Sequence, residues 1–181
     1  MASFLTITLF ILTSTFFITT NGIFYEELSE AIAMKRMEKS SHLHFFFHDI
    51  VSGKNATVVT IAGPPNVAFG TTMMIDDMLT EGPEPTSKLV GRAQGIYAMA
   101  AQYDVALLMV MNFAFVEGKY NGSSISLLGR NPVLDAVRDM PIVGGSGLFR
   151  FARGYALAHT IWYDPGTGDA IVEYNVSVLH Y

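Results

Sequence analysis

The run VALLMVMNFAFV, residues 105–116, decides how this chain folds. Its large apolar residues favour a strand, and with a period of two both faces of that strand are apolar. One face carries Leu107, Met109, Met111 and Phe113, and the other carries Leu108, Val110 and Ala114. Such a strand needs a hydrophobic interior on one side and a second cover on the other. Because the sequence offers no second sheet, we expect another copy of the chain to supply that cover.

The sequence around this run is also typical of a β protein. Stretches rich in Val, Ile, Thr, Phe and Tyr alternate with clusters of Gly, Pro and Asn. We expect strands over residues 43–51, 56–62, 68–76, 88–101, 104–117, 122–130, 138–143, 147–163 and 169–180. Many strands, few helical signals and no cysteine indicate an all-β fold, best closed as an antiparallel up-and-down β-barrel.

The N-terminal segment predicts secretion. Residues 1–25 carry no charged side chain, and an apolar run from Phe4 to Ile18 is too short and too polar to span a membrane. We expect a signal peptide over residues 1–22, a mobile leader over 23–41 and one β-barrel domain over 42–181. Three sequons, at Asn55, Asn121 and Asn175, predict glycosylation of a secreted chain.

The composition argues against several classes of function. Eleven Lys and Arg against sixteen Asp and Glu, with no basic cluster, disfavour nucleic-acid binding, and we expect no membrane association. The histidines are not spaced as metal ligands on strands, and cysteine is absent, so we expect no metal and no cofactor. The glycines at 144–147 match no phosphate-binding or dinucleotide-binding motif and indicate a bend before a long strand.

Two charged residues stand on strand faces that are otherwise apolar. In the expected strand 147–163, Arg153 shares a face with Phe149, Phe151 and Tyr155. An arginine there needs an anionic partner, either in a pocket for an acidic or phenolic group or in a structural ion pair inside a barrel. In the expected strand 43–51, Asp49 shares a face with Phe45 and Phe47 and is a natural complement to Arg153; alternatively, it begins a turn and faces water.

A tyrosine completes the set of polar candidates. Tyr97 lies on the same expected face as Ala93 and Gly95, where small neighbours leave room beside the ring. It is either a pocket hydroxyl or a core tyrosine that bonds to the backbone.

Several motifs, in this order along the chain, resemble those of plant dirigent proteins. They are HDI at 48–50, SGKN at 52–55, SKLVGRAQG at 87–95, NF at 112–113, GKYNGS at 118–123, GRN at 129–131, GGSGLFRFARGY at 144–155 and VEYNV at 172–176. The resemblance covers about residues 42 to 181. It implies an eight-stranded antiparallel barrel, similar to allene oxide cyclases and lipocalins, assembled as a homotrimer, with a homodimer as second choice.

The resemblance also implies a site. It selects Asp49, Arg153 and Tyr97 as catalytic residues. The residues expected to contact the substrate are Phe45, Phe47, Phe149, Phe151, Tyr155 and Leu148. Leu148 stands where the lignan-forming branch of the family usually has an aspartate, which points to the broader dirigent-like branch.

Three functions are compatible with this resemblance. The first is a dirigent function, in which a separate laccase or peroxidase makes phenoxy radicals and the barrel orients them for stereoselective coupling, with no oxidation by the protein itself. The second is a dehydrating cyclase similar to pterocarpan synthases, which acts through a quinone methide with Asp49 as the acid. The third is a secreted barrel that binds phenolic compounds without changing them.

Overall fold

The computed structural model describes residues 37–64 and 68–181, and these contain nine strands and two short 3₁₀ helices. The strands are β1 (Lys39–Asp49), β2 (Val58–Ala62), β3 (Thr72–Thr80), β4 (Leu89–Met99), β5 (Leu107–Phe115), β6 (Ser124–Asn131), β7 (Arg138–Ser146), β8 (Arg153–Tyr163) and β9 (Ala170–His180). The helices are η1 (Gly118–Tyr120) and η2 (Gly147–Phe149). The expected signal peptide and most of the expected leader lie outside the described residues, and β1 already begins at Lys39.

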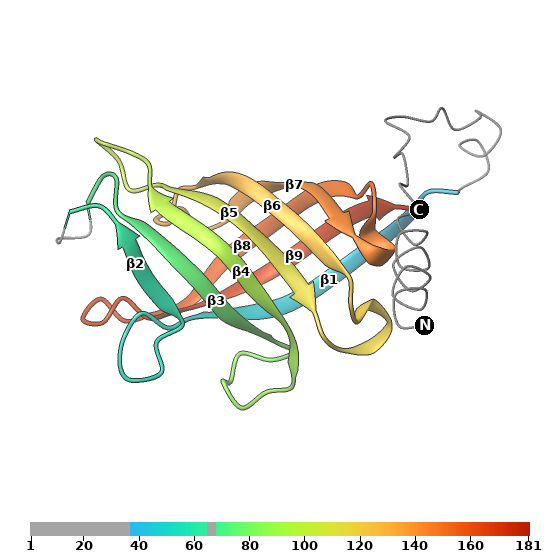
Figure 1. Ribbon diagram of the computed structural model, residues 1–181, viewed down its shortest axis with the longest axis horizontal. Helices are drawn as coiled ribbons and strands as arrows, with labels where there is room; N and C mark the ends of the chain where they lie inside the picture. Colours follow the sequence, from blue (N-terminus) through green and yellow to red (C-terminus); the bar gives the residue numbers. More distant parts are fainter. Residues whose placement is uncertain (1–36, 65–67) are drawn as a thin grey trace, which may run out of the picture. The chain divides into compact units, whose positions relative to one another are not determined.

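Antiparallel pairing closes eight of these strands into a barrel. The sheet runs in the order β1-β9-β8-β7-β6-β5-β4-β3, and β1 then pairs with β3 (Figure 1). The contact of β1 with β3 is short, from Phe46 opposite Thr80 to His48 opposite Met78. Beyond this contact β2 pairs with the same edge of β3, which protects that edge from unwanted pairing. The prediction of an eight-stranded antiparallel barrel is therefore confirmed.

Alternating side chains of the barrel strands fill the interior with aromatic rings. The rings of Phe45, Phe113 and Tyr174 lie 5.0–5.8 Å apart and come from three different strands. Edge-on and offset contacts at this distance stabilise an aromatic cluster beyond the burial of its area. Residues inside the barrel are thus fixed by packing, which also fixes any polar group placed among them.

Strand β5 has the two apolar faces that its sequence predicts. Met109, Met111 and Phe113 are buried in the interior. On the outer face Leu108 is 40% exposed and Val110 is 38% exposed, and Leu128 of β6 lies opposite Val110. This outer apolar stripe, formed by Leu108, Val110 and Leu128, is open to solvent in the single chain.

The segment after the four glycines differs from the prediction of one strand over 147–163. Helix η2 and a turn occupy residues 147–152, and β8 begins at Arg153. Gly147 has a φ of +61°, and a Cβ at this position would lie 2.5 Å from the Ser123 hydroxyl oxygen. Phe151 also adopts a positive φ, of 63°. The backbone therefore turns twice before β8, and residues 149–155 do not share one face.

Strand β3 lies further along the sequence than predicted, over Thr72–Thr80 in place of 68–76. Its later residues pair with β4 up to Thr80 opposite Leu89, so the strand continues past Asp76 and Asp77. The two aspartates therefore lie in mid-strand on opposite faces, which has consequences for the interior.

Candidate active site

The structure brings two of the three predicted catalytic residues together inside the barrel. Asp49 is the last residue of β1 and follows Phe45 and Phe47 on the inward face, where both phenylalanines are buried. Tyr97 comes from β4 and is buried as well. Its hydroxyl donates a hydrogen bond of 3.3 Å to Asp49 Oδ1. The carboxyl group of Asp49 thus has a defined orientation towards the interior, and Tyr97 is held by a side chain and not by backbone.

A second carboxyl group, which sequence analysis did not select, lies in the interior nearby. Asp77 of β3 is fully buried, and the Thr57 hydroxyl donates to its Oδ1 atom. Its Oδ2 atom has no hydrogen-bond partner among the described residues. Because a buried carboxylate oxygen without a partner is costly, this arrangement favours the neutral acid.

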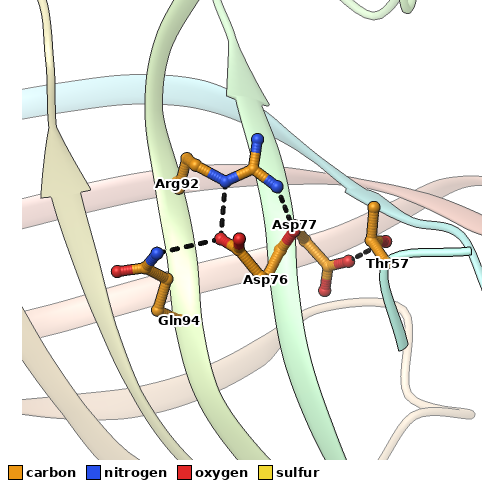
Figure 2. Close-up of polar contacts among 5 residues, drawn as sticks. All are labelled: Thr57, Asp76, Asp77, Arg92 and Gln94. Carbon is orange, nitrogen blue, oxygen red and sulfur yellow. Dashed lines mark hydrogen bonds and ion pairs between the residues drawn. The ribbon is translucent and has the colours of Figure 1, made fainter. Parts of the chain in front are cut away.

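The neighbouring Asp76 has the opposite environment. Figure 2 shows its carboxylate turned away from Asp77 and towards two side chains of β4. Arg92 Nε donates to Asp76 Oδ1 at 2.5 Å, and the Gln94 side chain donates to the same atom at 3.0 Å. Hydrogen bonding to Arg92 lowers the pKa of Asp76. Asp76 therefore remains ionised on the outer surface, one residue away from an acid of the interior.

Burial raises the pKa of both interior acids. The pKa of Asp49 rises to about 7: burial raises it, the Tyr97 hydrogen bond opposes the rise, and the negative charge of Asp169 adds to it. The pKa of Asp77 rises to about 8 through burial and then through the charge of Asp49, against the hydrogen bond from Thr57. A pair of this kind is protonated in mildly acidic solution and can donate protons to a bound molecule.

The interior also holds an arginine, but it is Arg138 and not Arg153. Arg138 is the first residue of β7, shares the inward face with Met140 and Ile142, and donates through Nε to Asn131 Oδ1 at 3.2 Å. Burial lowers its pKa, while Tyr174 and Asp135 oppose that effect. The alternation of Arg138, Met140 and Ile142 in the strand predicted over 138–143 is the signal that could have identified it.

The structure does not bring Arg153 to Asp49. The Arg153 side chain is 60% exposed on the outer face of β8, where its Nη2 atom lies 2.7 Å from Glu38 Oε1. The expected pairing of Arg153 with Asp49 is therefore wrong. The reason is the double turn at 147–152, which sets the register of β8 between β7 and β9. In this register Gly154 and Ala156 lie on the inward face of β8, and Arg153 lies on the outer face.

Some of the residues predicted to contact the substrate lie in the interior near Asp49, and the others do not. Phe45 and Phe47 line the interior next to Asp49. Leu148, Phe151 and Tyr155 are exposed. Phe149 is buried, but it packs on Tyr120 and His180 with ring centroids 4.8 Å and 5.0 Å away, remote from the acid pair.

A cavity of about 240 Å³ lies towards that remote end of the barrel. Its walls include Leu43, Phe45, Phe115 and Tyr120, with Lys88 and Lys119 at the rim. Phe45 is shared between this cavity and the surroundings of Asp49, because it stands four residues before Asp49 on the same inward face of β1. The cavity is thus apolar in its depth and charged at its edge.

Within residues 37–64 and 68–181, no group of three or more His, Asp or Glu side chains is placed to hold a metal ion. The described part of the chain also lacks a helix of the length and hydrophobicity needed to cross a membrane. Of the three sequon asparagines, Asn55 and Asn121 are exposed and Asn175 is half-buried on the outer face of β9.

Comparison with known proteins agrees with this architecture. A family model for dirigent-like proteins matches residues 40–179. Dirigent protein 7 of Arabidopsis thaliana is 56% identical over 148 residues, which is 81% of this chain and 80% of that protein. Pterocarpan synthase 1 of Glycine max is 49% identical, over 93% of this chain and 98% of that protein. The solved structure of the pterocarpan synthase dirigent protein GePTS1 matches with a TM-score of 0.83 at 48% identity, over 87% of this chain and 99% of that one.

The chain forms an antiparallel barrel with buried acids on its inner wall, and the family model matches nearly the whole barrel. These two observations define the class of this protein. The chain belongs to the dirigent family. Its relatives include proteins named dirigent proteins and proteins named pterocarpan synthases, at similar levels of identity.

Proposed function

We propose that this protein directs the stereochemistry of phenol coupling. A separate laccase or peroxidase supplies phenoxy radicals, and the barrel binds them in one relative orientation before they form a bond. The observation that carries this proposal is the group of Asp49, Asp77 and Tyr97 among buried aromatic rings on the inner wall. Aromatic surfaces bind phenol rings, and hydrogen-bonding groups at one point of the wall orient them.

The energy that such guidance requires is small. A tenfold preference for one coupling geometry corresponds to about 1.4 kcal/mol. One directed hydrogen bond to a phenol or quinone methide oxygen, together with a few ring contacts, is of this size. Coupling leaves a quinone methide, and a neutral Asp49 or Asp77 is suited to donate a proton to its carbonyl oxygen because the pKa of each is raised, to about 7 and about 8.

A second candidate function is a dehydrating cyclase, which the raised pKa values of the interior acids also support. In this reaction Asp49 donates its proton to a benzylic hydroxyl, the carbon–oxygen bond breaks and water leaves. A phenol conjugated with that carbon releases its proton to the Asp49 carboxylate, which restores the acid and gives a neutral quinone methide. The oxygen of a second phenol of the same molecule then adds to the benzylic carbon, and its proton passes to the quinone methide oxygen, which becomes a phenol again. The named pterocarpan synthases among the relatives support this candidate.

Oxidant dependence separates the two functions. In one assay the purified chain is incubated with a laccase and phenols that the laccase alone couples to racemic products. In a second assay it is incubated with an isoflavanol and no oxidant. The products of both assays are resolved by chiral chromatography. Enantiomeric excess in the first assay supports radical guidance, whereas turnover in the second supports the cyclase. Racemic or unchanged products in both, together with saturable binding of phenols, would mean that the barrel only binds them.

Secretion is part of the same proposal. The uncharged segment at residues 1–25 supports export, and the exposed sequons at Asn55 and Asn121 support glycosylation on that route. Thr57, which completes the first sequon, also donates to Asp77. A variant that removes this glycan should therefore be Asn55→Gln and not a change of Thr57, which would disturb the acid as well.

We also propose that the outer stripe of Leu108, Val110 and Leu128 is a contact between copies of the chain, in a trimer or, as second choice, a dimer. Replacing Val110 with lysine places a charge in this contact, so the particle mass in light scattering should fall to that of a monomer and the melting temperature should fall with it. Val59→Lys, at an exposed position on β2 away from the stripe, is the control that should retain the wild-type mass. A wild-type monomer at micromolar concentration would refute the assembly.

A further inference from the structure

The turn between β8 and β9 contains a carboxylate that is bound to the end of β1. Asp169 Oδ1 accepts hydrogen bonds from the backbone N–H groups of Val51 and Ser52, at 2.8 Å and 2.9 Å. Asp169 Oδ2 accepts from the Ser52 hydroxyl at 2.8 Å. All three donors belong to the two residues that follow directly after Ile50, and Asp49 itself pairs with Ala170, the neighbour of Asp169.

We propose that Asp169 is a positioning residue for Asp49: it clamps the exit of β1 to the β8–β9 turn and places a fixed negative charge beside the interior acid. This inference rests on the proposed function for its catalytic meaning, but the clamp itself is a property of the folded chain.

The clamp is effective because the turn that carries Asp169 is itself well bonded. The Asp164 N–H donates to the Asp169 carbonyl at 2.9 Å, and the Gly168 N–H donates to the Asp164 carbonyl at 2.8 Å. The Gly166 N–H donates to Asp164 Oδ1 at 2.8 Å. Without Asp169 the loop at residues 50–57 would keep its own bond from Thr57 N–H to the Ile50 carbonyl, at 2.8 Å, but would lose its connection to the turn.

The pKa values of Asp169 and Asp49 are shifted in opposite directions. Burial raises the pKa of Asp169, but the hydrogen bonds from Ser52 and Val51 outweigh it and lower the pKa overall. Asp169 is therefore ionised while Asp49 still holds its proton, because the pKa of Asp49 is raised to about 7. Two nearby carboxyl groups with opposite shifts divide the roles of anion and acid between them.

Other groups also face Asp49 and must be held constant in a test. They are Tyr97 from β4, which donates to it, Asp77 from β3, and Tyr174 from the inward face of β9. Arg138 from β7 acts on the same region through its proximity to Tyr174. None of these belongs to the clamp, so a change at Asp169 leaves each of them in place.

Two substitutions separate the charge of Asp169 from its hydrogen bonds. Asp169→Asn keeps the oxygen that accepts from the Val51 and Ser52 N–H groups, and its NH2 group can donate to the Ser52 hydroxyl oxygen, but the charge is removed. Asp169→Ala removes both the charge and the hydrogen bonds. Asp164→Asn, in the same turn, removes a charge that does not contact β1 and is the matched control. The readouts are the titration of the Asp49 side-chain carboxyl by NMR, hydrogen exchange at the Val51 and Ser52 amides, and the pH profile of activity.

We expect Asp169→Asn to move the Asp49 titration to lower pH while the two amides remain protected. Its activity should fall about twofold to threefold at pH 7 and match wild type at pH 5, because a smaller fraction of Asp49 is protonated at the higher pH. Asp169→Ala should show the same titration shift and, in addition, faster exchange at both amides. Asp164→Asn should behave as wild type in all three measurements.

An unchanged Asp49 titration in Asp169→Asn, or unchanged amide protection in Asp169→Ala, would overturn the inference. These two measurements need no substrate. If the wild-type chain instead converts no phenol at all, the proposed function fails, while the titration and exchange results still decide whether Asp169 positions Asp49.

Discussion

Asp49→Asn is expected to lose about 100-fold or more of the activity while the barrel remains folded. The asparagine oxygen can still accept the hydrogen bond that Tyr97 donates at 3.3 Å, so the local packing is preserved. The amide has no proton to transfer, however, and general acid catalysis typically contributes a factor of 10² to 10⁴. The measurement is the initial rate or the enantiomeric excess in the chiral assay, with circular dichroism and particle mass to verify the fold.

Asp76→Asn is the matched control for this experiment. Asp76 is ionised, lies on the outer face and bonds to Arg92 and Gln94, one residue from an interior acid (Figure 2). Loss of an exposed ion pair costs between zero and about 1 kcal/mol of stability, and Asp49 keeps its contact with Tyr97. The charge of Asp76 is only the smallest of the causes that raise the pKa of Asp77. Wild-type activity in Asp76→Asn and its loss in Asp49→Asn would place the chemistry inside the barrel; equal losses in both would contradict that location.

The second large effect concerns stability as a function of pH. In the unfolded chain Asp49 and Asp77 release their protons near the ordinary pKa of 3.8, whereas in the folded chain the pKa values are about 7 and about 8. Between these limits the folded state binds more protons than the unfolded state, so the free energy of unfolding falls as pH rises from about 4 to about 8. Below pH 4 both states are protonated and this loss is absent.

Removing either interior charge should therefore stabilise the protein in alkaline solution. At pH 8.5 we expect Asp49→Asn and Asp77→Asn each to raise the free energy of unfolding by a few kcal/mol, and the melting temperature by about 5 °C or more. At pH 4 both variants should melt close to wild type. Calorimetry at one fixed chain concentration provides the measurement, because assembly also affects the melting temperature. A gain that is equal at both pH values would show that it does not arise from ionisation.

The interior positions could be predicted from sequence wherever a strand was regular. In β5 a period of two separates Met109 and Phe113 on the buried face from Leu108 and Val110 on the outer face, as the structure has them. The same periodicity placed Asp49 after Phe45 and Phe47 on the inner wall. These predictions succeed because the side chains of a strand alternate strictly, so one known face determines all the others.

Predictions failed where the backbone left the strand. The prediction that Arg153 pairs with Asp49 assumes one continuous strand over residues 147–163, and the turns at Gly147 and Phe151 break that alternation. Asp77 was missed because the predicted strand ends at residue 76, which leaves Asp77 just outside it, whereas β3 continues to Thr80. Whether a strand continues depends on its partner, here β4, and the pairing of distant segments does not appear in the local sequence.

The sequence by itself therefore determined the class of fold, the family and the residue types available for chemistry. Periodicity and motif order are patterns along the chain itself, so both can be seen in the sequence without knowledge of the contacts between distant segments. The tertiary structure alone decided which polar groups meet: Asp49 with Tyr97 and Asp77 inside the barrel, Asp169 with the end of β1, and Arg153 with Glu38 outside. The physical reason is barrel closure, because the register of β1 against β3 and β9 sets these distances and depends on all the strands together.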